Sequence, residues 1–206
     1  PSSTRNICLA ITAPKYNIED GSPSSWSGEI DNLAAGVDNQ TDNRRLILIS
    51  AGNVCPEEFA SANYPNANIL HSVENPGQAW NALTVGAYND YIEIENKQFS
   101  GFHPVADVGE LSPYSSTSSM WDSKWPIKPE ILLNGGNIAT NGTDYSECPD
   151  FSLLSTSKDF LINPFSSIWA TRAATAQASW MAAQICIAYP GIWPETVRGL
   201  IVHSAR

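Results

Sequence analysis

The sequence predicts an α/β protein with a mostly parallel, doubly wound sheet that is flanked by helices. Residues 7–12 and 45–50 are continuous apolar runs of strand length, which is typical of parallel strands covered on both faces. Residues 26–37 lie between them and carry apolar side chains at steps of three and four, with serines just before, so we expect a capped amphipathic helix. Strand, helix and strand in this order imply a right-handed crossover and parallel pairing.

The middle of the chain repeats this pattern with longer connections. Residues 82–87 are predicted to form another strand, and a turn precedes them at residues 75–77. Residues 15–25 are predicted to form a polar loop. Residues 140–164 are rich in turn residues, so we expect an exposed loop there that flanks a substrate cleft.

Two helices are predicted to close the chain, separated by a Tyr-Pro-Gly turn at residues 189–191. The first shows small or apolar residues at helical spacing over residues 174–188. The second begins at Pro194, whose missing N–H would be unsatisfied at a first helical position anyway. Its expected buried stripe consists of Val197, Leu200 and Ile201.

Composition limits the classes of function. The chain has 206 residues of which 42% are hydrophobic, enough for one substantial core, and we expect a single domain over residues 1–206. Its formal net charge of −10 would repel a phosphate backbone, so nucleic acid is not an expected partner. No run of about 18 apolar residues and no signal peptide is found, so no membrane partner is expected and a cytoplasmic location is slightly favoured over secretion.

No metal or cofactor motif stands out. Cys8 and Cys186 lie in apolar runs and are expected to be small buried hydrophobes, although sequence alone leaves a disulfide open. The carboxylates of Asp20, Glu57 and Glu58 could hold calcium, but they lack the spacing of a calcium loop. We therefore expect no cofactor, with calcium as a weak alternative.

Several segments, in this order, resemble the C-terminal two-thirds of the catalytic domain of subtilisin-like serine proteases, the peptidase S8 family. The segments are residues 50–53 (SAGN), 82–87 (ALTVGA), 112–119 (SPYSSTSS), 127–136 (IKPEILLNGG), 170–176 (ATRAATA) and 194–201 (PETVRGLI). The resemblance implies that the N-terminal part of the domain is missing from this chain. It also implies a peptide or protein substrate.

The resemblance assigns roles to a few residues. In this family the loop matching residues 50–53 completes the oxyanion hole, so Asn53 is implied to donate its side-chain amide to the oxyanion that develops during peptide cleavage. The remaining implied residues line the substrate cleft. They are Ala10, Ile11, Thr12, Ala51 and Gly52.

The chain departs from the family at the position of the nucleophile. Arg172 stands where the family has its serine, and Ala170 stands where it has glycine. A cation at a helix N-terminus opposes the macrodipole by about 0.3–1 kcal/mol, so Arg172 is an unfavourable replacement unless it is paired or solvated. A shifted register with Thr171, Thr175 or Ser167 as the nucleophile remains an alternative.

The aspartate and histidine motifs of the family are absent as well. Residues 107–109 (DVG) come after Asn53 and are out of order for the aspartate motif, and none of the three histidines begins a His-Gly-Thr sequence. Without a base and a nucleophile this chain is expected to be inactive. Two hypotheses follow: part of an endopeptidase that is complete only with further segments, or a non-catalytic pseudoprotease that binds peptides or proteins. Uncovered sheet edges near residues 7–12 further suggest self-association.

Overall fold

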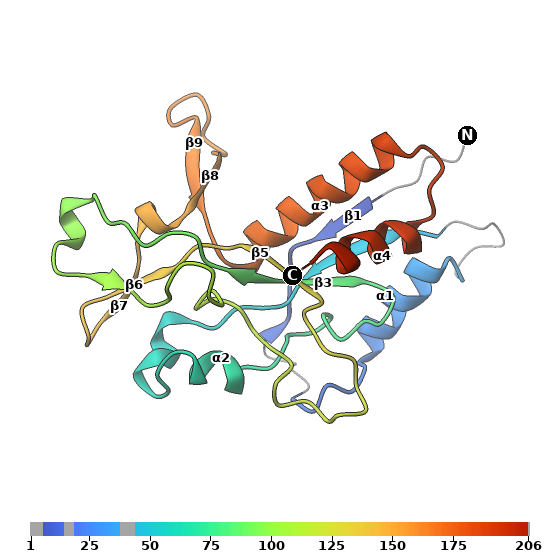
Figure 1. The fold of residues 1–206 in the computed structure, drawn as a ribbon, viewed down its shortest axis with the longest axis horizontal. Coiled ribbons are helices and arrows are strands. Elements are labelled where there is room, and N and C mark those ends of the chain that lie inside the picture. Colours follow the sequence, from blue (N-terminus) through green and yellow to red (C-terminus); the bar gives the residue numbers. More distant parts are fainter. Residues whose placement is uncertain (1–5, 15–18, 38–43, 206) are drawn as a thin grey trace.

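A four-stranded sheet forms the centre of the molecule (Figure 1). The computed structural model describes residues 6–14, 19–37 and 44–205, so residues 15–18 of the predicted polar loop lie outside it. The strands are β1 (Asn6–Leu9), β2 (Leu46–Ser50), β3 (Leu83–Tyr88) and β5 (Ile131–Asn134). They lie in the order β1-β2-β3-β5, and every neighbouring pair is parallel. The predicted α/β class with a parallel sheet is confirmed.

Helices cover both faces of this sheet (Figure 1). Helix α1 (Ser25–Ala35) packs on one face, and α3 (Ala170–Ala188) and α4 (Pro194–Ser204) pack on the other. Strand β2 is buried along its whole length because its side chains alternate between two clusters. Leu46 and Leu48 belong to the cluster with α3 and α4, whereas Ile47 and Ile49 belong to the cluster with α1.

Smaller elements extend the molecule beyond one end of the sheet (Figure 1). One antiparallel sheet contains β4 (His103–Pro104), β6 (Ile138–Thr140) and β7 (Tyr145–Glu147). A projecting hairpin contains β8 (Leu153–Thr156) and β9 (Phe165–Ile168). The short helices are η2 (Pro56–Ala60), α2 (Asn66–Leu70), η3 (Lys97–Phe99) and η4 (Pro149–Phe151). The prediction of a plain loop over residues 140–164 is thus wrong, because β7, η4 and β8 lie within it.

Strand β1 differs most from its prediction. It is shorter than the expected residues 7–12, and both Ile7 and Cys8 are exposed rather than covered on two faces. Among the described residues no strand pairs with its outer edge, which explains why an apolar run remains in contact with solvent. Cys8 is therefore not a buried hydrophobe, and Cys186 is half-buried. Self-association through this edge stays a prediction.

Helix boundaries were predicted to within a turn. The serine N-cap of α1 is confirmed, because the Ser24 side chain accepts a hydrogen bond from the Ser27 amide. The helix ends at Ala35, so Val37 lies beyond it and is exposed. Helix α3 begins at Ala170, four residues before the predicted stripe, since the stripe marks only the part that packs on the sheet.

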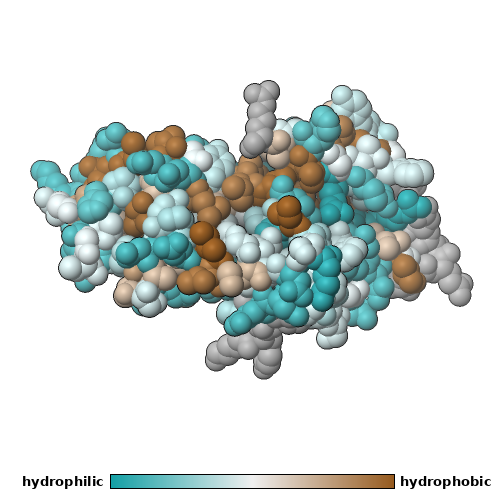
Figure 2. Space-filling view, turned by 60° about the horizontal axis from the view of Figure 1, so that its bottom comes forward, coloured by the Kyte–Doolittle hydropathy of each residue, from teal (hydrophilic) through white to brown (hydrophobic). Residues whose placement is uncertain are grey.

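The buried stripe of α4 was predicted partly wrongly. Val197 and Ile201 are buried, but Leu200 is 46% exposed. Val197 and Ile201 belong to the core cluster with α3 and the sheet, whereas Leu200 lies outside this cluster. Hydrophobic side chains reach the surface elsewhere too, as Figure 2 shows by its brown patches between hydrophilic regions. None of the described helices combines the length and the apolar character that crossing a membrane requires.

Candidate active site

The loop that follows β2 meets the N-terminus of α3, although 118 residues separate them in sequence. The Asn53 side-chain oxygen accepts hydrogen bonds from the Thr171 amide at 3.0 Å and from the Thr171 hydroxyl at 2.8 Å. That hydroxyl also lies 3.2 Å from the Gly52 carbonyl. With its oxygen engaged, the Asn53 amide still has two N–H donors for another acceptor.

The backbone turns sharply at Ala170, just before these contacts. Ala170 has a φ of 68°, in the left-handed region that strongly favours glycine. Its amide donates to the Gly135 carbonyl at 2.7 Å, which fixes the turn against the end of β5. The family's glycine position thus keeps a glycine-like conformation here although the residue is alanine.

Arg172 occupies the third position of α3 and is exposed. Its Nε donates to the Trp169 carbonyl at 3.2 Å, and its guanidinium carbon lies 5.4 Å from the centroid of the Trp169 ring. This contact and the surrounding solvent reduce the conflict between the cation and the positive end of the helix dipole. Arg172, which follows Thr171, therefore supplies a cation and no hydroxyl beside Asn53.

Two of the predicted cleft residues, Thr12 and Gly52, converge on a buried glutamate that sequence analysis did not single out. Glu74 is 3% exposed, and its carboxylate accepts a hydrogen bond from the Thr12 hydroxyl. The backbone N–H of Asn53 donates to the same carboxylate, with 3.5 Å between the nitrogen and Glu74 Oε1. Gly52 has a φ of 102°, and a Cβ there would lie 2.5 Å from the Glu74 Cγ, so the side chain packs directly on the glycine backbone. Glu74 can be identified as part of the site only from these contacts in the folded structure.

His71 links Glu74 to a second carboxylate. Its Nε2 lies 3.3 Å from Glu74 Oε1, and its Nδ1 lies 3.0 Å from Glu58 Oε2. The hydrogen bond to Glu74 raises the pKa of His71, and Glu58 adds to this effect, while burial acts in the opposite direction. His71 and the two glutamates thus form one network of ionisable groups.

The other predicted cleft residues differ in their exposure to solvent. Ala51 is fully buried at the end of β2, where its carbonyl accepts from the Glu74 amide at 2.8 Å. Ala10 and Ile11 follow β1 and are exposed. The structure therefore brings Thr12, Ala51 and Gly52 together around Glu74, while Ala10 and Ile11 remain on the surface beside them.

In the described part of the chain, the other two histidines make no contact with Asn53, Thr171, Glu74 or His71. His103 lies in β4 and is exposed, and His203 is exposed near the end of α4. Residues 6–14, 19–37 and 44–205 contain no group of three or more potential metal ligands. Of the carboxylates considered for calcium, Asp20 accepts hydrogen bonds from Ser22, and Glu58 is bound to His71.

This site lies at the carboxyl end of a parallel strand, where open α/β sheets place their ligands. It offers an amide donor, a helix N-terminus and a buried carboxylate. Fold and site together define an α/β domain with a candidate site at the end of β2. The model of the subtilase family, peptidase S8, matches residues 2–206, and the chain belongs to this family.

The chain is also similar to individual proteins over nearly its whole length. The uncharacterized protein y4bN of Sinorhizobium fredii is 23% identical over 216 residues, which cover 98% of this chain and 48% of the relative. Among solved structures, the S41 psychrophilic protease has a TM-score of 0.52 with 21% identity, over 96% of this chain and 48% of the other. Sphericase has a TM-score of 0.51 with 18% identity, over 97% and 48%. These structures show the subtilisin-like fold, and the chain spans about half the length of these relatives.

Proposed function

We propose that this chain is part of a subtilisin-like serine endopeptidase domain that binds an extended peptide but does not cut it alone. In this proposal Asn53 donates to a peptide carbonyl, Arg172 occupies the nucleophile position, and Ala10–Thr12 together with Ala51 and Gly52 line the cleft. The contact between Asn53 and Thr171, next to the left-handed turn at Ala170, carries the proposal. Such a donor stabilises an oxyanion only when it is already aimed at the reacting carbonyl.

The groups around this contact support the proposed absence of hydrolysis. The Thr171 hydroxyl donates to Asn53, and the Thr175 hydroxyl is buried and donates to the Thr171 carbonyl at 2.7 Å. His71 is held between two glutamates and is not hydrogen-bonded to any described hydroxyl. Acyl transfer needs a nucleophile whose proton an oriented base removes, and these residues form no such pair.

A second candidate function is a non-catalytic peptide-binding module. The observation that favours it is Arg172, because its guanidinium is tied to Trp169 in the place where a nucleophile would act. A cation at that point can attract a peptide carbonyl or carboxylate without cleaving anything. In this reading the cleft and the Asn53 donor are retained for binding.

The first experiment measures catalysis. The unmodified chain and Arg172→Ser are incubated with a fluorophosphonate probe and with a chromogenic peptide, and neither labelling nor hydrolysis is expected because no base is in place. Hydrolysis by the unmodified chain that disappears in Asn53→Ala but persists in Asn32→Ala would overturn the proposal. Asn32 is a suitable control because it is an exposed asparagine in α1.

The second experiment separates the two candidates. Arg172→Ser is fused to an upstream segment that carries the aspartate and histidine motifs of a subtilisin-like protease. Labelling that appears only in this fusion supports the endopeptidase domain. A blocked extended peptide that binds the unmodified chain, and binds about two- to tenfold more weakly to Asn53→Ala, together with no labelling of the fusion, supports the binding module.

A further inference from the structure

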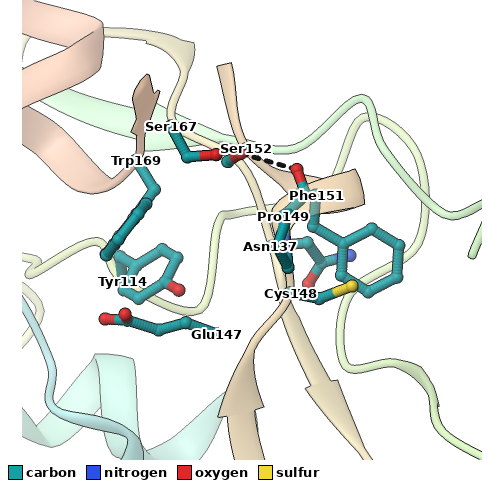
Figure 3. A pocket seen from close by; sticks show the side chains of 9 residues that line it. All are labelled: Tyr114, Asn137, Glu147, Cys148, Pro149, Phe151, Ser152, Ser167 and Trp169. Atoms are coloured by element: carbon teal, nitrogen blue, oxygen red, sulfur yellow. Dashed lines mark hydrogen bonds between the residues drawn. The ribbon is translucent and has the colours of Figure 1, made fainter. Parts of the chain in front are cut away.

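A separate cavity lies beside the N-terminus of α3 (Figure 3). It has a volume of about 240 Å³, and none of the residues that we assign to the cleft lines it. Since one water occupies about 30 Å³ of liquid, the cavity has room for a group of roughly eight non-hydrogen atoms. Its lining consists of Tyr114, Asn137, Glu147, Cys148, Pro149, Phe151, Ser152, Ser167 and Trp169.

One side of the cavity combines aromatic rings with a carboxylate. Figure 3 shows the side chains of Trp169, Tyr114 and Glu147 next to one another, with Asn137, Cys148 and Phe151 across from them. Trp169 is the N-cap residue of α3, and Glu147 is the last residue of β7. Rings of this kind attract cations through their faces, and the carboxylate supplies the opposite charge.

Two polar groups in this cavity are available to a ligand. Tyr114 is 3% exposed, and no described residue makes a hydrogen bond to its hydroxyl. Burial and the charge of Glu147 raise the pKa of Tyr114, so the phenol stays protonated. The Glu147 carboxylate likewise has no ion pair or hydrogen bond to another side chain in the described part of the chain.

Asn137 and Ser152 are already hydrogen-bonded within the protein, whereas the Ser167 hydroxyl has no hydrogen-bond partner among the described residues. The Asn137 oxygen accepts from the Ala106 amide at 3.2 Å, and its nitrogen donates to the Tyr91 carbonyl at 3.0 Å. The Ser152 hydroxyl donates to the Pro149 carbonyl at 2.6 Å. A ligand therefore meets apolar walls, the buried phenol of Tyr114, and the exposed polar groups of Glu147 and Ser167.

We propose that this cavity binds the side chain of a lysine or arginine, with its aliphatic stem against the apolar walls and its cationic group between Glu147, Tyr114 and Trp169. Long basic side chains match such a site because their stems are apolar and their ends are charged. Arg172 already places a guanidinium over the Trp169 ring, which shows that this ring accepts a cation, yet Arg172 does not line the cavity. That the side chain comes from a peptide in the neighbouring cleft rests on the proposed function.

The test uses two small molecules of equal shape, n-butylguanidinium and the neutral n-butylurea, in NMR titrations of the complete chain. We expect n-butylguanidinium to shift the amide signals of residues 147, 148, 150–152 and 169, and to bind about fivefold or more tightly than n-butylurea because its hydrogen bonds are charge-assisted. Glu147→Gln should remove this preference. Glu93→Gln removes the same charge from an exposed site that does not line the cavity, so the preference should remain.

Equal affinities of the two molecules, or a preference that survives Glu147→Gln, would overturn the proposal. So would the absence of shifts at residues 147–152 in the unmodified chain. Tyr114→Phe provides a second check, since it keeps the ring and should weaken both molecules by loss of the hydroxyl alone. If n-butylguanidinium binds as expected while extended peptides do not bind, the proposed function fails and the cavity assignment stands.

Discussion

Replacement of Ala170 by glycine tests the backbone geometry on which the active-site proposal rests. Ala170 has a φ of 68°, and a non-glycine residue in left-handed geometry costs about 1–2 kcal/mol. Glycine removes this strain. It also removes a methyl group that is 2% exposed and packs in the cluster with Val54, Phe59 and Tyr114, at a cost of about 0.8 kcal/mol.

Glycine has a further cost, because it gives the unfolded chain more conformational freedom, worth about 0.4–1 kcal/mol. These opposing effects are of similar size, so we expect Ala170→Gly to change the free energy of unfolding by less than about 0.8 kcal/mol in either direction. The matched control is Ala178→Gly in the middle of the same helix, where the residue is 0% exposed. There glycine relieves no strain, and helix propensity and lost burial together predict a loss of about 2 kcal/mol.

Urea unfolding followed by tryptophan fluorescence measures both variants. The expected loss in Ala178→Gly corresponds to a decrease of about 4–8 °C in Tm for a chain of this size, whereas Ala170→Gly should stay close to the unmodified protein. If Ala170→Gly were as destabilising as Ala178→Gly, residue 170 would not have a left-handed backbone. The alignment of Arg172 with the nucleophile position would then lose its main structural support.

Two further predictions concern ionisable side chains. Iodoacetamide should alkylate Cys8 well before Cys148 in the native protein, because Cys8 is exposed whereas Cys148 is buried. Burial also raises the pKa of Cys148. Equal alkylation rates of the two cysteines, measured by mass spectrometry, would contradict this prediction. The pKa of His71 in the folded state is raised above its ordinary value of 6.5, so protonation of His71 stabilises the fold. This stabilisation is fully present below pH 6.5 and is lost as the pH rises through the folded-state pKa. His71→Gln should therefore be most destabilising under acidic conditions in urea unfolding, and a gap to the unmodified chain that widens with pH would refute this reasoning.

Sequence patterns predicted the positions of strands and helices better than the burial of their side chains. Residues 7–12 and 45–50 are both continuous apolar runs, yet β2 is buried on both faces while Ile7 in β1 is exposed. Periodicity within a strand reports which side chains are apolar, but burial depends on which other elements cover that strand. Leu200 is a second example, because its apolar side chain fits a helical stripe but lies outside the core cluster and is 46% exposed.

The candidate site was likewise predictable only in part. Asn53 could be singled out because the motif around it resembles a family signature, and the structure places it against the N-terminus of α3. Glu74 could not, since a lone glutamate before a turn carries no signal until the chain folds it onto Gly52 and Thr12. Tyr114 and Trp169 also escaped notice, because their rings meet at a cavity formed by segments more than 50 residues apart.

Trp169 connects the two proposals of function. Its carbonyl and its ring hold the Arg172 guanidinium at the position that we propose for the family's nucleophile, and the same ring forms a wall of the cavity with Tyr114 and Glu147. A side chain that enters the cavity must therefore share this ring with Arg172, and two cations at one ring repel each other unless Glu147 compensates the second. We accordingly infer that Arg172 affects how tightly the cavity binds a cation, even though it lies outside the lining. In that case the proposed replacement of the nucleophile by Arg172 and the proposed recognition of a basic side chain are linked through one indole ring.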